Sequence, residues 1–207
     1  MQRIQGRRCL ELDMPALIQR ARANECALLD LGAGDGRFVA HVARAYPNSL
    51  AIGLDACREN LIEWSRRAPE NAVFLVANAL MLPEELTEIA TRLTIHFPWG
   101  SLLTGLLDAP AFCARLVSLV RPGATLEVAL NGGAPAEAGW TLEAGSQRIQ
   151  SNLRAAGFSL RAPQVWGAAE LRACPTTWAR RLAFGRDPRA VFLAGVWKGE
   201  RDAVVRP

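Results

Sequence analysis

The sequence predicts an α/β fold built on a doubly wound, mostly parallel seven-stranded sheet. Two observations predict it: short apolar runs rich in Val, Ile and Leu recur along the chain, and segments with helical periodicity separate them. This alternation is typical of parallel strands joined by crossover helices. The predicted strands cover residues 27–31, 50–54, 72–76, 92–97, 124–130, 158–165 and 190–197.

Helices are expected between these strands. The candidate segments are residues 38–46, 58–67, 110–120 and 146–156. Phe38, Val42 and Tyr46 recur at every fourth position of the first segment, so they form one apolar face. Asp35 is placed to cap this helix at its N-terminus. Residues 132–145 are rich in Gly, Ala and Pro and are predicted to form a loop.

Length and composition fit a single domain over residues 1–207, with a short basic extension at residues 1–12. Half of the residues are hydrophobic and the formal charge is +4. Lys198 is the only lysine, so arginine supplies nearly all of the positive charge. Because arginine pairs with phosphate through two parallel hydrogen bonds and stacks on bases, its abundance is compatible with RNA binding.

The patterns of membrane, secreted and metal-binding proteins are missing from the sequence. The five cysteines are scattered without a CxxC pair, which predicts neither a disulfide framework nor a metal site. The N-terminus lacks the apolar segment of a signal peptide, and no run of about 18 apolar residues occurs. We therefore expect a soluble cytoplasmic monomer that uses no metal and binds no membrane.

A glycine-rich turn follows the first predicted strand, in the segment LLDLGAGDG at residues 28–36. Gly32, Gly34 and Gly36 allow the backbone to turn tightly and a ligand to come close. Similar turns bind dinucleotides or are purely structural, and this one lacks the GxGxxG spacing that seats a pyrophosphate on a helix. The turn alone leaves its ligand open.

Polar residues at the ends of the next strands point to S-adenosylmethionine. Asp55 ends the second strand about 20 residues after the turn, where a carboxylate accepts hydrogen bonds from the hydroxyls of a ribose. Asp30 would face the ammonium of the methionine moiety, and Asn78 would frame the adenine. A sulfonium cofactor also needs no phosphate-binding helix end. The expected contacts are Asp30, Gly32, Gly34, Asp55, Ala56, Asn78, Ala79 and Leu80.

Two tryptophans lie in motifs that suit the binding of an unstacked base. Trp99 stands in HFPWGSLL at the end of the fourth predicted strand, on a turn made by its Pro and Gly neighbours. Trp178 stands in PTTWARRLAFGR, among hydroxyls and cations. The two rings could sandwich a base while Arg181, Arg186 and Arg189 grip the flanking phosphates. The alternative is that Trp99 packs under the following helix.

With LLDLGAGDG and LAIGLDA, these motifs resemble the aminoglycoside-resistance 16S rRNA (adenine(1408)-N(1))-methyltransferases over nearly the whole chain. The resemblance implies a class I, Rossmann-like enzyme that uses S-adenosylmethionine and methylates a flipped adenine in the 16S rRNA of the 30S subunit. It implies that Trp99 and Trp178 stack on that adenine. Pro98, Ser101 and Thr176 would line the cofactor or shape the pocket. The arginines implied in RNA binding are Arg3, Arg7, Arg8, Arg66, Arg67, Arg181, Arg186 and Arg189.

Three features depart from the resemblance and bear on affinity for the target. Asp187 offsets the charge of Arg186, and Arg189 stands one place from the position of the expected second cation. The predicted loop at residues 132–145 is also short for the family and carries little charge, with Glu137 and Glu143 as its charged residues. The reaction itself needs no general base, because adenine N1 carries a lone pair and no proton. Catalysis then consists mainly of positioning N1 near the methyl group. His96 is accordingly expected to be structural.

Three alternatives remain open at this point. The first half of the chain is also similar to tRNA guanine-N7 methyltransferases. In a small-molecule methyltransferase the tryptophans would wall an aromatic substrate. A noncatalytic RNA-binding module could keep the same fold, and cofactor binding would distinguish it from the enzymes.

Overall fold

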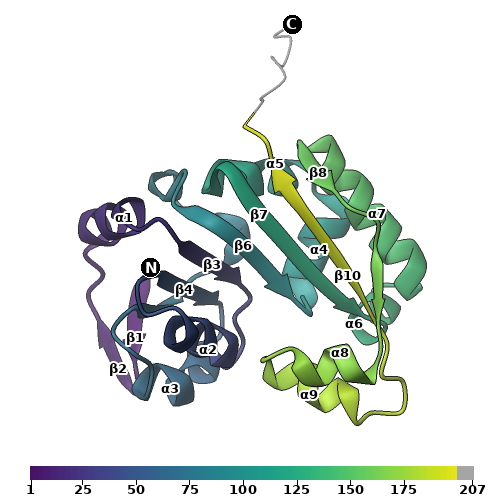
Figure 1. Ribbon diagram of the computed structural model, residues 1–207, viewed down its shortest axis with the longest axis horizontal. Helices are drawn as coiled ribbons and strands as arrows, with labels where there is room; N and C mark the ends of the chain where they lie inside the picture. Colours follow the sequence, from purple (N-terminus) through teal and green to yellow (C-terminus); the bar gives the residue numbers. More distant parts are fainter. Residues whose placement is uncertain (200–207) are drawn as a thin grey trace, which may run out of the picture.

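The computed structural model describes residues 1–199 as one ten-stranded sheet with helices on both faces (Figure 1). The strand order is β2-β1-β5-β4-β3-β6-β7-β10-β8, and β9 pairs with β10. The five strands from β3 to β7 are parallel, which confirms the doubly wound α/β class. The strands are β1 Gln2–Gln5, β2 Arg8–Leu10, β3 Ala27–Leu31, β4 Leu50–Asp55, β5 Ala72–Val76, β6 Ala90–His96, β7 Val120–Asn131, β8 Phe158–Leu160, β9 Gln164–Trp166 and β10 Ala190–Trp197.

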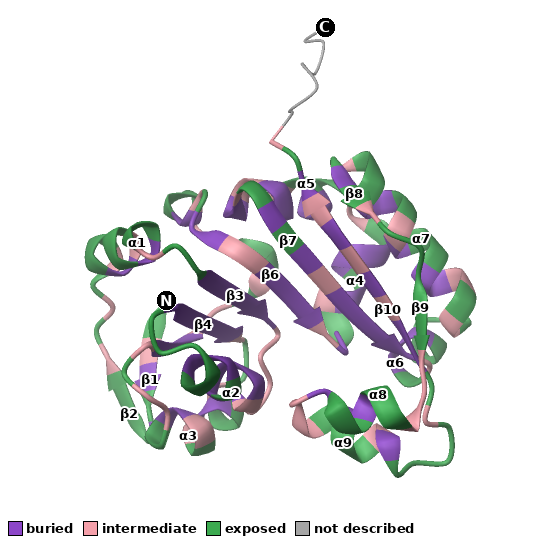
Figure 2. Cartoon of the chain, in the orientation of Figure 1, coloured by how far each residue is buried: buried purple, intermediate pink, exposed green. Residues whose placement is uncertain are grey.

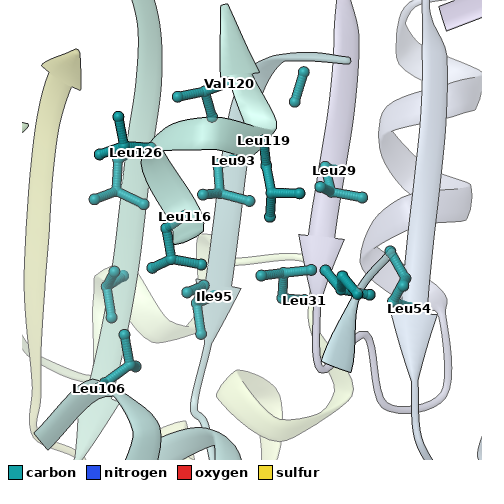
Figure 3. Close-up of a cluster of buried hydrophobic side chains, with 14 of the residues drawn as sticks. Leu29, Leu31, Leu54, Leu93, Ile95, Leu106, Leu116, Leu119, Val120 and Leu126 are labelled. Atoms are coloured by element: carbon teal, nitrogen blue, oxygen red, sulfur yellow. The ribbon is translucent and has the colours of Figure 1, made fainter. Parts of the chain in front are cut away.

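Helices cover the two faces of the sheet in separate groups (Figure 1). Leu29 and Leu31 of β3 pack into one cluster with Leu106 and Leu116 (Figure 3), whereas Leu28 packs on α2 and α3 across the sheet. Side chains alternate across a strand, so β3 and β4 are buried along their length (Figure 2). The helices are α1 Met14–Ala23, α2 Arg37–Ala45, α3 Arg58–Arg66, α4 Gly100–Asp108, α5 Pro110–Leu119, α6 Gly133–Glu137, α7 Leu142–Ala155, α8 Ala168–Ala173 and α9 Thr177–Ala183, with 3₁₀ turns η1 Ala79–Met81 and η2 Glu84–Leu86.

The first residues of the chain belong to the sheet. β1 and β2 form an antiparallel hairpin, and β1 pairs with β5, so this segment extends the sheet beyond the seven strands expected. Gly6 turns the hairpin with a φ of 58°, and its N–H donates to Ser65 Oγ at 2.9 Å. The basic residues of the N-terminus are thereby held against α3.

The strand predicted at residues 158–165 is wrong as a single strand. β8 pairs with β10 between Gly195 and Trp197, and β9 pairs with β10 between Ala190 and Phe192. Pro163 lies in the break between them and has no N–H to donate to a ladder.

The loop predicted at residues 132–145 is also wrong, because it contains α6 and the first turn of α7. Thr141 caps α7 by accepting the N–H of Ala144 at 3.1 Å. Helices α1, α4, α8 and α9 were not predicted either. In α4, Gly105 weakens helix propensity but allows tight packing, since a Cβ there would lie 2.6 Å from Leu80.

Candidate active site

A cavity of about 630 Å³ opens at the carboxyl ends of β3, β4 and β6. Connections leave β3 toward β4 on one side and β6 on the other, and such switch points form the ligand crevice of open α/β sheets. Leu80 was expected in the cavity wall but is not part of it. The expected residues that do line the cavity are Asp30, Gly32, Gly34, Asp55, Ala56, Asn78, Ala79, Pro98, Trp99, Ser101, Thr176, Trp178 and Arg181.

The glycine-rich turn forms the floor between β3 and α2. Gly32 and Gly34 have φ values of 73° and 57°, a region that disfavours other residues. A Cβ at Gly34 would meet no atom within 4 Å, so this backbone faces open space. Asp55 fixes the turn, because its Oδ2 accepts the Gly34 N–H at 2.8 Å while its Oδ1 accepts the Cys57 N–H at 2.8 Å.

Asp30 is a buried carboxyl in the wall of the cavity, with 2% of its surface exposed. Burial raises its pKa from 3.8 to about 7, although a hydrogen bond from Thr94 Oγ1 at 2.6 Å and the charge of Arg92 act in the opposite direction. The guanidinium of Arg92 donates two hydrogen bonds to the Glu127 carboxylate, from Nε at 3.0 Å and from Nη2 at 2.8 Å. Within the described chain Asp30 therefore lacks a close cationic partner of its own, and a ligand ammonium would supply one.

His96 ends β6 and lies in the same wall. Burial and the charge of Arg92 lower its pKa to about 3, so the imidazole is neutral near pH 7. Its ring meets Phe38 edge to face at 4.6 Å, and within residues 1–199 its buried Nδ1 has no hydrogen-bond partner. The structural role expected for His96 stays a prediction.

The segment after β6 turns Trp99 outward over the cavity. Phe97 is buried with a φ of 54°, a strained conformation for a residue with a Cβ, and Gly100 also has a φ of 54°. Trp99 is 45% exposed and Trp178 is 39% exposed, so Trp99 does not pack under the following helix. Pro98 lies between the strained residue and the ring, and it lines the cavity.

The two indoles contact each other edge to face, with ring centroids 5.9 Å apart and planes at 74°. A base held between parallel rings separates them by about twice the 3.4 Å stacking distance, roughly 7 Å. The expected sandwich therefore requires the two rings of Trp99 and Trp178 to separate and rotate, and it stays a prediction.

Asp35 is not the N-cap residue of α2 that it was expected to be, and it also accepts a hydrogen bond from a distant part of the chain. The residue at the N-cap of α2 is Gly36, and Asp35 Oδ1 accepts the N–H of Arg37 at 3.1 Å. Its other oxygen, Oδ2, accepts the hydroxyl of Thr177 at 2.5 Å. Thr177 also lines the cavity, and nothing in the local pattern of either segment signals this pairing.

The arginines expected to bind RNA fall into two groups on either side of the cavity. In the first, Arg58 donates to the carbonyl of Arg7 at 2.8 Å, which joins the N-terminal hairpin to α3. This group includes Arg3, Arg7, Arg8, Arg66 and Arg67. Close by, the guanidiniums of Arg37, Arg44 and Arg67 lie 5.7, 5.5 and 5.2 Å from the ring centroid of Trp64.

The second group lies at and after α9. Arg181 lines the cavity and Arg186 is exposed beyond the helix. Asp187 was expected to offset the charge of Arg186, but it pairs with Arg189 instead. The Arg189 guanidinium donates two hydrogen bonds to the Asp187 carboxylate, at 2.7 and 3.0 Å. Because both side chains of this pair are mostly exposed, the pair is worth little and can open.

Among residues 1–199, no group of three or more His, Cys, Asp and Glu side chains is arranged to hold a metal ion. In the same part of the chain no single helix is long and apolar enough to cross a membrane. Helices α4 and α5 meet that test only when taken together, across a bend of 102°.

Comparison with known proteins gives one consistent result. Residues 2–197 match the family described as NpmA: 16S rRNA (adenine(1408)-N(1))-methyltransferase. A protein of that description from Streptoalloteichus hindustanus is 34% identical over 204 residues, which cover 90% of this chain and 94% of the relative.

Two solved structures extend this comparison. The aminoglycoside resistance methyltransferase NpmB1 has a TM-score of 0.76 at 27% identity, over 95% of this chain and 98% of NpmB1. A W203A mutant of the Catenulisporales acidiphilia 16S rRNA (adenine(1408)-N(1))-methyltransferase, solved with the cosubstrate SAM, has a TM-score of 0.81 at 24% identity, over 99% of this chain and 100% of that one. At this identity the second structure supports the fold alone.

Proposed function

The chain belongs to the family of 16S rRNA (adenine(1408)-N(1))-methyltransferases, and from that membership we propose that it methylates N1 of adenine 1408 in 16S rRNA. S-adenosylmethionine is the methyl donor. The observation that carries the proposal is one cavity that joins the carboxyls of Asp30 and Asp55 and a glycine turn to two exposed indoles. Modification of this adenine is expected to confer aminoglycoside resistance.

The residues of the cavity fit S-adenosylmethionine. Asp30 offers a buried carboxyl to the methionine ammonium, Asp55 offers carboxylate oxygens to the ribose, and Gly34 leaves open space beside the turn. Asn78 and Ala79 would border the adenine ring of the cofactor. When bound, the cofactor supplies an electrophilic methyl group on a sulfonium.

The residues on the acceptor side position a base and need not move a proton. Trp99 and Trp178 would stack on the adenine from its two faces. Since N1 has a free lone pair and no proton, holding it near the methyl is the main catalytic task, and the transfer needs no general base. As methylation makes the adenine ring cationic, each indole face would stabilise it by roughly 0.5 to 2 kcal/mol.

Docking on the ribosome would use both groups of arginines. Those on the hairpin and α3 would bind phosphates on one side of the cavity, while Arg181 and Arg186 would hold the backbone of the flipped nucleotide on the other. We further propose that the substrate is the 30S subunit, and that the protein acts in the cytoplasm as a single-domain monomer without a metal. Arginine forks suit phosphate contacts of this kind.

Labelled S-adenosylmethionine and intact 30S subunits test the proposal. The protein should transfer label to 16S rRNA, and primer extension should stop at adenine 1408 because methylation blocks the Watson–Crick edge. Transfer to tRNA or only to small molecules would refute the acceptor, and cofactor binding without any transfer would favour a noncatalytic module.

A further inference from the structure

We propose that Asp35 and Thr177 are positioning residues, whose hydrogen bond holds Trp178 in register with the cofactor-binding turn. The inference rests on the proposed function and adds to it a connection between the two halves of the cavity. Thr177 Oγ1 donates to Asp35 Oδ2 at 2.5 Å, and the two residues are 142 positions apart in the chain. Both line the cavity.

The carboxylate of Asp35 is oriented by its own segment. Gly34 and Gly36, on either side, have φ values of 57° and 79°, so the backbone direction at Asp35 is set by a tight turn. Asp35 Oδ1 accepts the N–H of Arg37 at 3.1 Å, which leaves Oδ2 for Thr177. The turn itself is fixed to β4, since the Ala33 N–H donates to the Leu54 carbonyl at 2.7 Å.

The helix that carries Trp178 is short and packs on the sheet through small side chains. α9 has seven residues, and its buried side chains are only Ala179 and Ala183. Both alanines belong to a buried cluster with Phe97, which packs the helix on the sheet, but their small side chains bury little apolar area. A hydrogen bond to a carboxylate is about twice as strong as one between neutral groups. The bond from Thr177 therefore ties the first turn of α9, next to Trp178, to the cofactor-binding turn.

The hydroxyl of Thr177 is not needed to cap the helix. Thr176 is the N-cap residue of α9, and its Oγ1 accepts the N–H of Ala179 at 2.9 Å. Thr177 is thus free to point across the cavity, and Trp178 follows it directly. One series of contacts then leads from Asp55, which holds the turn through the Gly34 N–H, to the stacking ring.

The test replaces Thr177 by valine, which keeps the shape and removes the hydroxyl. With saturating S-adenosylmethionine, T177V should lower kcat for methylation of 30S subunits by about tenfold or more, as expected for loss of a hydrogen bond to a charged group. The Kd for S-adenosylmethionine should stay within about twofold, and T177S should recover most of the activity. T104V is the matched control, because the Thr104 hydroxyl donates only to the Gly100 carbonyl of its own helix, α4.

A double-mutant cycle identifies the partner. If Asp35 and Thr177 act through one bond, T177V should cause almost no further loss of kcat in a D35A background. Additive losses would overturn the pairing. Wild-type activity in T177V, or a loss of cofactor affinity as large as the loss of kcat, would overturn the positioning role.

Hydrogen exchange separates this inference from the proposed function, since it needs no substrate. T177V should exchange the amides of Ala179 to Ala183 faster than the wild type, because α9 opens more readily without the bond. Faster exchange would uphold the link even if the wild type did not methylate 30S subunits, in which case the proposed function would fail alone. Unchanged exchange together with unchanged kcat would overturn the inference.

Discussion

Replacing Asp30 by asparagine should remove a pH dependence that burial of its carboxyl imposes on the fold. The folded-state pKa of about 7 lies above the unfolded value of 3.8, so the folded protein holds this proton more tightly. The stabilisation is fully present below pH 3.8 and is lost as pH rises through about 7. At 1.36 kcal/mol for each pKa unit, the ionised carboxyl costs the fold up to roughly 4 kcal/mol.

Urea denaturation at several pH values measures this cost. Between about pH 4 and about pH 8, the free energy of unfolding of the wild type should fall relative to that of D30N, by up to roughly 4 kcal/mol. His96 changes stability in the opposite direction, because its lowered pKa costs stability as pH falls below 6.5. This contribution is common to both proteins and cancels in the difference. Parallel pH profiles for wild type and D30N would refute the reasoning.

The same carboxyl links cofactor binding to pH. The ammonium of S-adenosylmethionine would favour ionised Asp30, so binding should release a proton near neutral pH. Calorimetry in buffers of different ionisation enthalpy would detect the release in the wild type and not in D30N. Equal proton release in both proteins would exclude Asp30 as its source.

Three further predictions concern RNA. Trp178→Ala should abolish methylation while the Kd for S-adenosylmethionine changes only severalfold; a large loss of cofactor affinity would mean that the ring is structural. Replacing Arg66 and Arg67 by alanine should raise KM for 30S subunits and reduce the slope of log K against log salt by about one for each phosphate that the variant no longer binds. Asp187→Ala should lower that KM, because it frees the Arg189 guanidinium for phosphate.

Arg154→Ala serves as the control for the charge variants. Arg154 is exposed on α7, across the sheet from α9, and it bonds Gln150 within its own helix at 2.9 Å. An equal rise in KM for R154A and for the variant that replaces Arg66 and Arg67 by alanine would indicate a general effect of net charge. A KM for D187A that equals the wild-type value would mean that Arg189 stays away from the RNA.

Local sequence patterns predicted the elements that are buried on both faces. β3 and β5 begin and end at the expected residues, because a parallel strand between helices must be apolar throughout. The segment around α4 fails this rule. Its glycines disfavour a helix, and packing against neighbours that are remote in sequence decides its structure, which no local pattern encodes.

In the candidate site, too, local sequence patterns located some residues, whereas others depend on the packing of remote segments. Asp30, Asp55 and Asn78 could be located because the carboxyl ends of neighbouring parallel strands meet at one edge, whatever the details of packing. The bond between Asp35 and Thr177 could not, since it depends on how α9 lies on the sheet. The raised pKa of Asp30 also depends on burial by the whole fold, which a motif does not reveal.

The edge-to-face contact between Trp99 and Trp178 favours catalysis over ground-state binding in the proposed reaction. In that reaction an incoming adenine would separate two rings whose contact is worth about 0.5 to 1.5 kcal/mol. Stacking of the base would contribute about 1 to 3 kcal/mol at each ring, and the loss of the contact between the two indoles would offset part of this binding free energy. The cation–π attraction arises only as the methyl group is transferred and the adenine becomes positive. Because that attraction is stronger in the transition state than in the bound substrate, it raises kcat and leaves KM little changed.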